Sequence, residues 1–313
     1  MENAALVLEG GAIRGIFSAG VLDFLMEREV QFPYVASVSA GTCCAMGYLS
    51  GQIGRTRACM MPDPETRYYG LQQLRESGKL MDLRKIFLEY PYGRFPFDFS
   101  AYFTSGIEHE IVVTDRADGL PRYLQERSDE MRLSLGAMAS CSIPLLNAPV
   151  ELDGRFYYDG GVGDSIPVGR ALSKGYGKVV AVLTRRAGVY PEVSAKAQAA
   201  YRVFFRHDPQ FRDAILSRPA RYRAQMAYLS RLEAQGRAFL IRPMNRSCPT
   251  WRRIQSWQPA TTAMATPGWR SSGRLCKRFW ERPETKKFAA LRRSVSSRRG
   301  GNFDGFIGRR PWT

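Results

Sequence analysis

Short apolar runs alternate with helical patterns along the first 244 residues of the chain. The runs that are typical of buried strands lie at residues 4–8, 34–38, 110–114, 156–158, 178–184 and 238–241. Helical spacing follows at 16–25 and 42–49, and an Arg-rich helical stretch covers 194–237. Residues 55–103, rich in proline and aromatic residues, are expected to be loop-rich. Because strands and helices alternate, the pattern predicts a doubly wound α/β sheet in one domain, residues 1–244.

The last 69 residues do not follow this pattern. Residues 245–313 contain only five Ile, Leu or Val, carry 16 Lys and Arg against 3 acidic residues, and hold all five Trp. The first 244 residues contain all 15 Tyr and carry a net charge of +4, out of +17 for the whole chain. Five aliphatic side chains offer too little apolar surface to offset the roughly 1–2 kcal/mol per residue needed to order a backbone. We therefore expect a basic, disordered tail.

Three interpretations of this tail remain open. Arginines interleaved with tryptophans are typical of arms that bind single-stranded nucleic acid, and a basic segment is attracted to anionic membranes. The abrupt loss of Tyr and aliphatic residues after Met244 is what translation in a shifted reading frame would produce. We favour the shifted frame, which argues against nucleic acid as a partner. The nucleotide sequence from codon 240 onward would decide whether residues 245–313 are a genuine C-terminus.

Composition narrows the class of protein. With 44% apolar and 24% charged residues, the chain resembles a globular protein and not a collagen, a disulfide scaffold or a disordered chain. Six cysteines without a CxxC motif indicate reduced thiols, and two histidines, His109 and His207, argue against a His-built metal site. No metal or cofactor is expected. Residues 30–54 are uncharged but contain Gln, Pro and several Gly, which favours a buried strand–turn–helix over a membrane span. Without a signal-peptide pattern, we expect a cytoplasmic protein that meets membranes only peripherally.

Ser39 gives the sharpest chemical signal in the sequence. It lies where the predicted strand 34–38 turns directly into a helix, with Ser37 and Gly41 two residues to either side. Small residues at these two positions permit a nucleophile elbow, which projects the serine Oγ from the strand end. The N-terminus of the following helix favours negative charge at that place. The alternative is that Ser39 only caps the helix.

A glycine-rich loop, Gly10-Gly11-Ala12-Ile13-Arg14-Gly15, follows the first predicted strand. Backbone amides in such a loop can cradle a phosphate or stabilise an oxyanion. A dinucleotide-binding loop would be followed about 20 residues later by an acidic residue, yet no Asp or Glu occurs between Glu29 and Asp63. The sequence therefore disfavours dinucleotide binding and leaves an oxyanion loop or a structural turn.

Asp159 follows the predicted strand 156–158 and precedes Gly160 and Gly161. It is either a turn residue or a functional carboxylate at a strand end. A catalytic triad in the order Ser-Asp-His would need a later histidine, and only His207 qualifies, in an Arg-rich helical context that indicates the surface. The residues present favour a Ser–Asp pair.

Together, the three blocks resemble the signature of the patatin-like phospholipase family, and of its bacterial members in particular. Weaker similarity at 114–115, 139–144 and 164–167 extends the resemblance over about residues 4–243. It implies a three-layer α/β/α sandwich with a mainly parallel central sheet. Two departures stand out: Ser37 occupies a position where the family usually has glycine, and Ala12 replaces a third glycine of many members. Both replacements are small, so the turn and the loop should persist.

The resemblance also implies the role of each site residue. Ser39 corresponds to the nucleophile and Asp159 to the general base. The oxyanion hole corresponds to the backbone of Gly10, Gly11 and Ala12 with Arg14 nearby, and the remaining motif residues are Gly15, Ser37, Gly41, Gly160 and Gly161.

The implied function is a serine lipid acyl hydrolase, a phospholipase or esterase that cleaves lipid or small acyl-ester substrates through an acyl-serine intermediate. A carboxylate base needs a dry pocket that raises its pKa, which Ile143, Phe156 and Tyr157 are expected to supply. The alternative is a catalytically silent protein of the same fold that binds membranes or nucleic acid through the basic tail.

Overall fold

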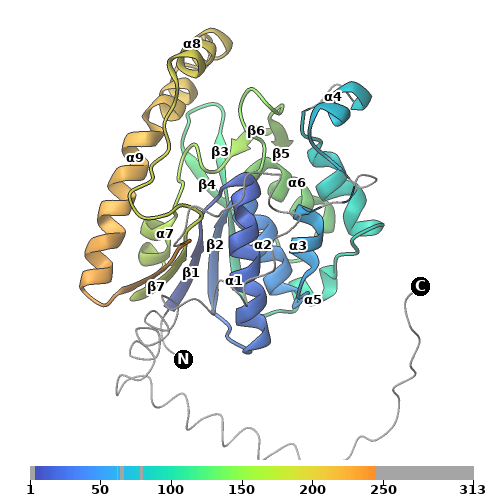
Figure 1. The fold of residues 1–313 in the computed structure, drawn as a ribbon, viewed down its shortest axis with the longest axis vertical. Helices are drawn as coiled ribbons and strands as arrows, with labels where there is room; N and C mark the ends of the chain where they lie inside the picture. Colours follow the sequence, from blue (N-terminus) through green and yellow to red (C-terminus); the bar gives the residue numbers. More distant parts are fainter. Residues whose placement is uncertain (1–3, 62, 64–66, 78–79, 244–313) are drawn as a thin grey trace, which may run out of the picture. The chain divides into compact units, whose positions relative to one another are not determined.

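The fold is built on an eight-stranded sheet in a computed structural model that describes residues 4–61, 63, 67–77 and 80–243 (Figure 1). The strand order is β5-β6-β3-β2-β1-β7-β8, with β4 paired to β3. The strands are β1 (Ala4–Leu8), β2 (Tyr34–Val38), β3 (Glu108–Asp115), β4 (Pro121–Leu124), β5 (Val150–Leu152), β6 (Arg155–Asp159), β7 (Lys178–Val182) and β8 (Ala238–Ile241). The predicted tail, residues 245–313, lies outside the described residues, and the predicted boundary at 244 stays a prediction.

The centre of the sheet is parallel and one of its sides is antiparallel. Strands β3, β2, β1, β7 and β8 run parallel to one another, whereas β4 and β6 run antiparallel to β3, and β5 antiparallel to β6. Parallel neighbours need a crossover connection, which here contains helices. The predicted mainly parallel α/β/α sandwich is confirmed.

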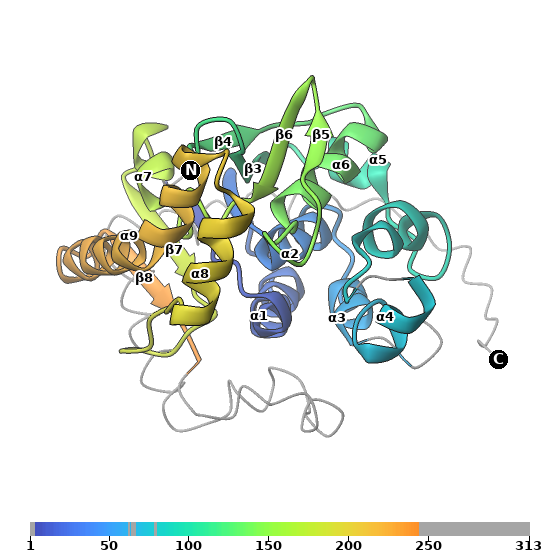
Figure 2. The ribbon, with the colours of Figure 1, turned by 90° about the horizontal axis from the view of Figure 1, so that it is seen from above.

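Helices cover both faces of the sheet (Figure 2). The helices are α1 (Gly15–Glu27), α2 (Ala40–Leu49), α3 (Arg55–Met60), α4 (Leu71–Ser77), α5 (Phe99–Phe103), α6 (Glu130–Ser140), α7 (Val168–Ser173), α8 (Ala195–Phe204) and α9 (Pro209–Ala234), with 3-10 turns at Ala12–Arg14 and Tyr90–Tyr92 and a π turn at Lys85–Glu89. Helices α1, α2 and α6 pack on one face, and α7 and α9 on the other. No helix in the described ranges is long and apolar enough to cross a membrane.

Alternation along β1 shows how the strands join the two layers. Leu6 and Leu8 belong to the apolar core on the α1/α2 face, while Ala5 and Val7 belong to the core on the α7/α9 face. Successive side chains of a strand point to opposite faces, so a strand between two helical layers must be apolar on both. This is why its sequence is a continuous apolar run.

The structure confirms the predicted strands and corrects several boundaries. The strand predicted at 178–184 ends at Val182, because the Thr184 side chain turns toward the glycine loop. The region 55–103, expected to be loop-rich, contains α3, α4 and α5. The stretch 194–237 forms two helices, since Pro209 begins a new one. Strands β4 and β5 were missed because they are short and only partly apolar.

Candidate active site

Ser39 occupies the sharp turn between β2 and α2. Its backbone has φ 53° and ψ −126°, a conformation that residues other than glycine rarely adopt. The side chain makes no capping hydrogen bond to α2, and instead Oγ donates to Asp159 Oδ2 at 2.7 Å. The helix-cap interpretation of Ser39 is therefore wrong. The predicted elbow geometry explains both the strained backbone and the direction of the hydroxyl.

Close packing explains the small residues around the elbow. A Cβ on Gly41 would lie 2.9 Å from Leu8 O, and one on Gly15 would lie 2.7 Å from Ala40 Cβ. Both distances are shorter than real Cβ contacts, so Gly41 lets α2 approach the end of β1 and Gly15 lets α1 approach α2. Any larger residue would push the helix behind Ser39 away from the sheet.

Asp159 is held from several sides at the end of β6. Its side chain is 8% exposed, Oδ2 accepts from Ser39, and Oδ1 accepts from the Gly161 amide at 2.7 Å. Burial raises the pKa of Asp159, opposed first by the positive charge of Arg218 on α9 and then by these hydrogen bonds. A carboxylate with a raised pKa accepts a proton more readily.

Sheet register brings Ser39 and Asp159 together across 120 positions of sequence. Val38 of β2 pairs with Val112 of β3, and the next residue of β3, Val113, pairs with Asp159. The carboxylate therefore lies level with the end of β2. Gly160 completes the arrangement, because a Cβ there would lie 2.1 Å from Val112 O, so only glycine fits.

The glycine loop lies against the nucleophile. A Cβ on Gly10 would lie 2.9 Å from Ser39 Cβ, so the missing side chain allows the loop backbone to approach the serine. No described residue accepts a hydrogen bond from the amides of Gly10, Gly11 or Ala12. Ala12 has φ 47°, which explains why a glycine suits this position better. The loop thus presents unpaired donors beside Ser39, as an oxyanion hole requires.

Glu9 and Thr184 hold this loop in place. The Thr184 hydroxyl donates to Gly10 O at 2.8 Å, and its amide donates to Glu9 Oε2 at 2.6 Å. Tyr222 of α9 donates to the other Glu9 oxygen at 2.9 Å. Burial raises the pKa of Glu9, opposed by these hydrogen bonds and then by the positive charges of Arg185 and Arg14.

The structure places Arg14 on the Glu9 side of the loop. No described residue makes a hydrogen bond with its buried Nε, and no hydrogen bond joins it to Ser39 or Asp159 within the described residues. Its charge acts on Glu9, Tyr222 and Arg185. Arg14 ends the 3-10 turn Ala12–Arg14 that follows the glycines, and its part in an oxyanion hole stays a prediction.

A buried polar network behind the elbow accounts for Ser37. Its hydroxyl bonds to His109 Nε2 at 2.7 Å and to Thr42 Oγ1 at 3.1 Å. Thr42 in turn lies 3.2 Å from Ser140 Oγ, which accepts the Ser39 amide at 2.8 Å. The extra hydroxyl at position 37 is therefore fully satisfied, and the network fixes the backbone of the nucleophile.

Neither histidine contacts the Ser–Asp pair. His109 is buried, bonds to Ser37 and to Tyr102, and burial lowers its pKa to about 3. His207 is exposed, as predicted, and its Nε2 accepts a hydrogen bond from Arg206. Ser39 Oγ instead donates its hydrogen bond to Asp159 Oδ2.

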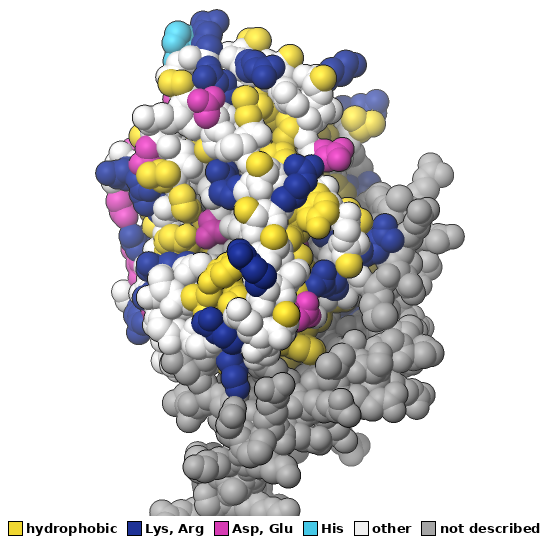
Figure 3. All heavy atoms as spheres, turned by 90° about the vertical axis from the view of Figure 1, so that its left-hand side faces the viewer, with side chains coloured by type: hydrophobic (Ala, Val, Ile, Leu, Met, Phe, Trp, Pro, Cys, Tyr) yellow, Lys and Arg dark blue, Asp and Glu magenta, His cyan; other side chains and the backbone are white. Residues whose placement is uncertain are grey.

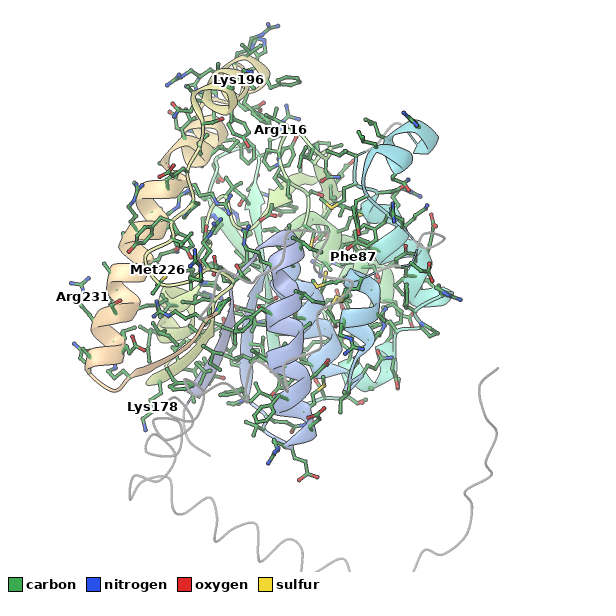
Figure 4. The ribbon with its side chains drawn as sticks, viewed as in Figure 1. Phe87, Arg116, Lys178, Lys196, Met226 and Arg231 are labelled. Atoms are coloured by element: carbon green, nitrogen blue, oxygen red, sulfur yellow. The ribbon has the colours of Figure 1, made fainter. Side chains whose placement is uncertain are left out.

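A largely apolar cavity of about 660 Å³ opens at Ser39. Its walls come from α2, from α3 and from the region 67–91, which includes Phe87 (labelled in Figure 4). The lining includes Ala12, Ser39, Cys43, Met46, Cys59, Met60, Leu71, Leu83, Phe87 and Ile143. A buried apolar cavity beside a nucleophile can hold an acyl chain out of water.

The prediction of which residues shield the Asp159 carboxylate from water is partly wrong. Ile143 does line the cavity, but Phe156 is 45% exposed, and neither it nor Tyr157 lines it. Side chains alternate between the two faces of β6, so Phe156 lies on the opposite face from Asp159. The apolar character of Phe156 alone did not indicate its face. The cavity-forming region 55–91 was missed because its helices are short and interrupted by prolines.

Other supporting residues were missed for a different reason. Glu9 directly precedes the glycine loop, and Ser140 lies in the block 139–144, so their positions in the motifs were a usable signal. Thr184, Arg218 and Tyr222 gave none, because their neighbours in space lie far away in sequence.

Comparisons with known proteins place the chain in a family. Residues 6–172 match the sequence model of a family described as "Patatin-like phospholipase". The chain is 31% identical over 196 residues to "Uncharacterized protein YjjU" of Escherichia coli (strain K12), an alignment that covers 59% of this chain and 53% of that protein. The chain therefore spans about half the length of this relative. The crystal structure of VipD from Legionella pneumophila aligns with a TM-score of 0.45 at 13% identity, over 82% of this chain and 65% of that one.

Proposed function

This chain belongs to the patatin-like phospholipase family, whose members are in general lipid acyl hydrolases, and from that premise we propose that it cleaves lipid esters with Ser39 and Asp159. One observation carries the proposal. The Ser39 hydroxyl donates to a buried carboxylate at 2.7 Å, in the lining of an apolar cavity and beside unpaired loop amides. This arrangement supports a nucleophile, a base and oxyanion donors that act at one point.

The reaction is acyl transfer to water in two steps. Asp159 Oδ2 takes the Ser39 proton while Oγ attacks the ester carbonyl carbon, and the amides of Gly10, Gly11 and Ala12 stabilise the oxyanion. The protonated Asp159 then gives its proton to the departing alcohol. A water molecule attacks the acyl-serine with Asp159 again as base, the acid leaves, and the proton returns to Ser39.

The cavity supports a long acyl chain as the group that is transferred. About 660 Å³ of largely apolar space lies within the range of small-molecule pockets, roughly 300–1,000 Å³. Each methylene that enters contributes about 0.8 kcal/mol of transfer free energy. Hydrolysis should therefore become more efficient as the acyl chain lengthens from two to about ten carbons.

Exposed leucines at the rim support peripheral contact with a lipid surface. Leu71, which lines the cavity, is 71% exposed, and Leu74 on the same helix and Leu80 are 42% and 40% exposed. Exposed apolar side chains grouped at the mouth of a cavity are typical of lipid or protein contact sites. On this proposal they enter the membrane surface and allow an acyl chain to pass directly into the cavity.

The test is hydrolysis of p-nitrophenyl esters together with labelling by a fluorophosphonate. Ser39→Ala should lose both hydrolysis and labelling while its circular dichroism stays unchanged, because only a hydroxyl is removed. Ser173→Ala, an exposed serine on α7, is the matched control and should keep both. Hydrolysis that persists in purified Ser39→Ala, or an inactive parent protein that binds lipid, would refute the proposed function.

A further inference from the structure

A second cavity, of about 270 Å³, lies between the chain that follows β7 and the helix α9. Its lining includes Arg185, Arg186, Tyr190, Tyr222, Arg223 and Arg242. It shares no lining residue with the Ser39 cavity. Figure 4 labels one residue of each, Met226 on α9 for this cavity and Phe87 for the other, on opposite sides of α1. We call this second cavity the arginine pocket.

Four guanidinium groups share the arginine pocket, and no carboxylate lines it. Arg185 Nε lies 3.6 Å from Glu9, and Arg242 lies 3.8 Å from Glu233, whose side chain is 47% exposed. Within the described ranges, Arg186 and Arg223 form no ion pair. Positive charge thus exceeds the negative charge that faces it.

The surroundings keep the charge of Arg185 partly away from water. Burial lowers the pKa of Arg185, and the neighbouring charge of Arg14 lowers it further. Arginine nevertheless stays protonated in proteins, so the group remains a desolvated cation with an unfavourable neighbour. Like charges gathered in a concave site raise the local concentration of anions. Lys and Arg side chains are also spread over the α9 side of the molecule (Figure 3).

The walls of the arginine pocket are held in place before any ligand binds. Tyr222 is fixed by its hydrogen bond to Glu9, and its ring lies edge-on to Tyr190 with centroids 6.3 Å apart. Arg223 lies over the Tyr190 ring at 5.9 Å, and Arg185 over the Tyr222 ring at 5.8 Å. Preorganised guanidinium groups lose less freedom when they form hydrogen bonds.

We propose that the arginine pocket binds a phosphate group, either of a free phosphate ester or of a phospholipid head group. The planar guanidinium fork matches two phosphate oxygens at once, and several arginines can serve the oxygens of one phosphate. Arg186 and Arg223, which lack a carboxylate partner, provide most of the binding. This site lies outside the proposed hydrolytic site and does not depend on hydrolysis.

The first experiment titrates the full-length protein with inorganic phosphate and with glycerol 3-phosphate by calorimetry in a chloride buffer. Arg186→Gln/Arg223→Gln should bind about 100-fold more weakly, at roughly tenfold per lost charged hydrogen bond. Arg202→Gln/Arg231→Gln removes the same charge from exposed positions on α8 and α9 outside the arginine pocket, and should change binding by less than twofold. Both variants retain the basic residues 245–313, and Ser39→Ala should bind phosphate as the parent does.

The second arm measures co-sedimentation with phosphatidylcholine vesicles that do or do not contain phosphatidic acid. Tight binding of the soluble esters assigns the site to a free phosphate ester. If the protein binds the vesicles and only the Arg186→Gln/Arg223→Gln variant loses this binding, the site is assigned to a head group. Equal losses in the two double variants, or no loss in either, would overturn the proposal. Circular dichroism checks that each variant is folded.

Discussion

The two cavities lie at the carboxyl ends of strands of one sheet, and they differ in the polarity of their lining. The cavity at Ser39 is large and mostly apolar, whereas the arginine pocket is smaller and lined by four arginines. Both use chain that follows parallel strands, after β2 in the first and after β7 in the second. Ligand sites in open α/β sheets lie outside the carboxyl ends of the strands. The strands thus set where a site forms, and the covering helices set what it binds.

The glycine loop lies between the two regions. Gly10 packs against Ser39, and the preceding Glu9 accepts a hydrogen bond from Tyr222, which also lines the arginine pocket. Helix α9 likewise contributes to both, with Arg218 acting on Asp159 and Arg223 lining the arginine pocket. Variants that change one region and leave the other intact therefore test whether the two are separate.

The largest effect is expected from Asp159→Asn. An amide cannot take the Ser39 proton, so ester hydrolysis should fall by at least about 10³-fold. His207→Ala should retain full activity, because this histidine is exposed and bonds only Arg206 among the described residues. The measurement is kcat/KM on a p-nitrophenyl ester. A comparable loss in His207→Ala would show a triad and refute the Ser–Asp pair.

Gly11→Ala should reduce kcat by about 10²-fold. The new Cβ would lie 2.5 Å from Thr184 Oγ1, so the loop must shift, and losing one oxyanion donor typically costs roughly 10²–10³ in rate. Gly169→Ala on α7 is the control, since a Cβ there meets nothing within 4 Å. Unchanged kcat in Gly11→Ala would show that this loop does not hold the oxyanion.

Arg218→Gln should move the acidic limb of the pH–activity profile to higher pH. The Arg218 charge lowers the pKa of Asp159 against the effect of burial, so its loss raises that pKa further. More Asp159 is then protonated, and unable to act as base, at any pH below the limb. Activity should fall several-fold on the acidic limb and little on the alkaline side of the profile. Arg231→Gln on the same helix serves as the control, and a limb that stays in place would argue against Asp159 as the base.

Ala12→Gly should have the smallest effect. Its φ of 47° costs a residue with a Cβ roughly 1–2 kcal/mol, which glycine avoids while gaining freedom in the unfolded chain. The two contributions oppose each other, so the unfolding free energy measured in urea should rise by no more than about 1 kcal/mol. Activity should stay within about twofold. A clear loss of stability would mean that the Ala12 methyl group packs in a way that its exposure does not suggest.

Local signals in the sequence determined the fold and much of the site. Continuous apolar runs predicted the buried strands, because a strand between two helical layers is apolar on both faces. The glycine loop, the elbow at Ser39 and the strand end at Asp159 depend on neighbouring residues alone. The roles assigned to them stay predictions until the variants are measured.

Only the tertiary structure decided how distant segments meet. Strand register places Asp159 level with Ser39, packing of the region 67–91 forms the apolar cavity, and α9 brings Arg223 to the chain after β7. The serine at position 37 is explained only by its hydrogen bond to His109, which lies 72 positions away in the sequence. Periodicity and local motifs reflect interactions between residues that are close in the sequence. Cavities and buried hydrogen bonds form between segments that are far apart in the sequence, and such contacts leave no local pattern from which they could be predicted.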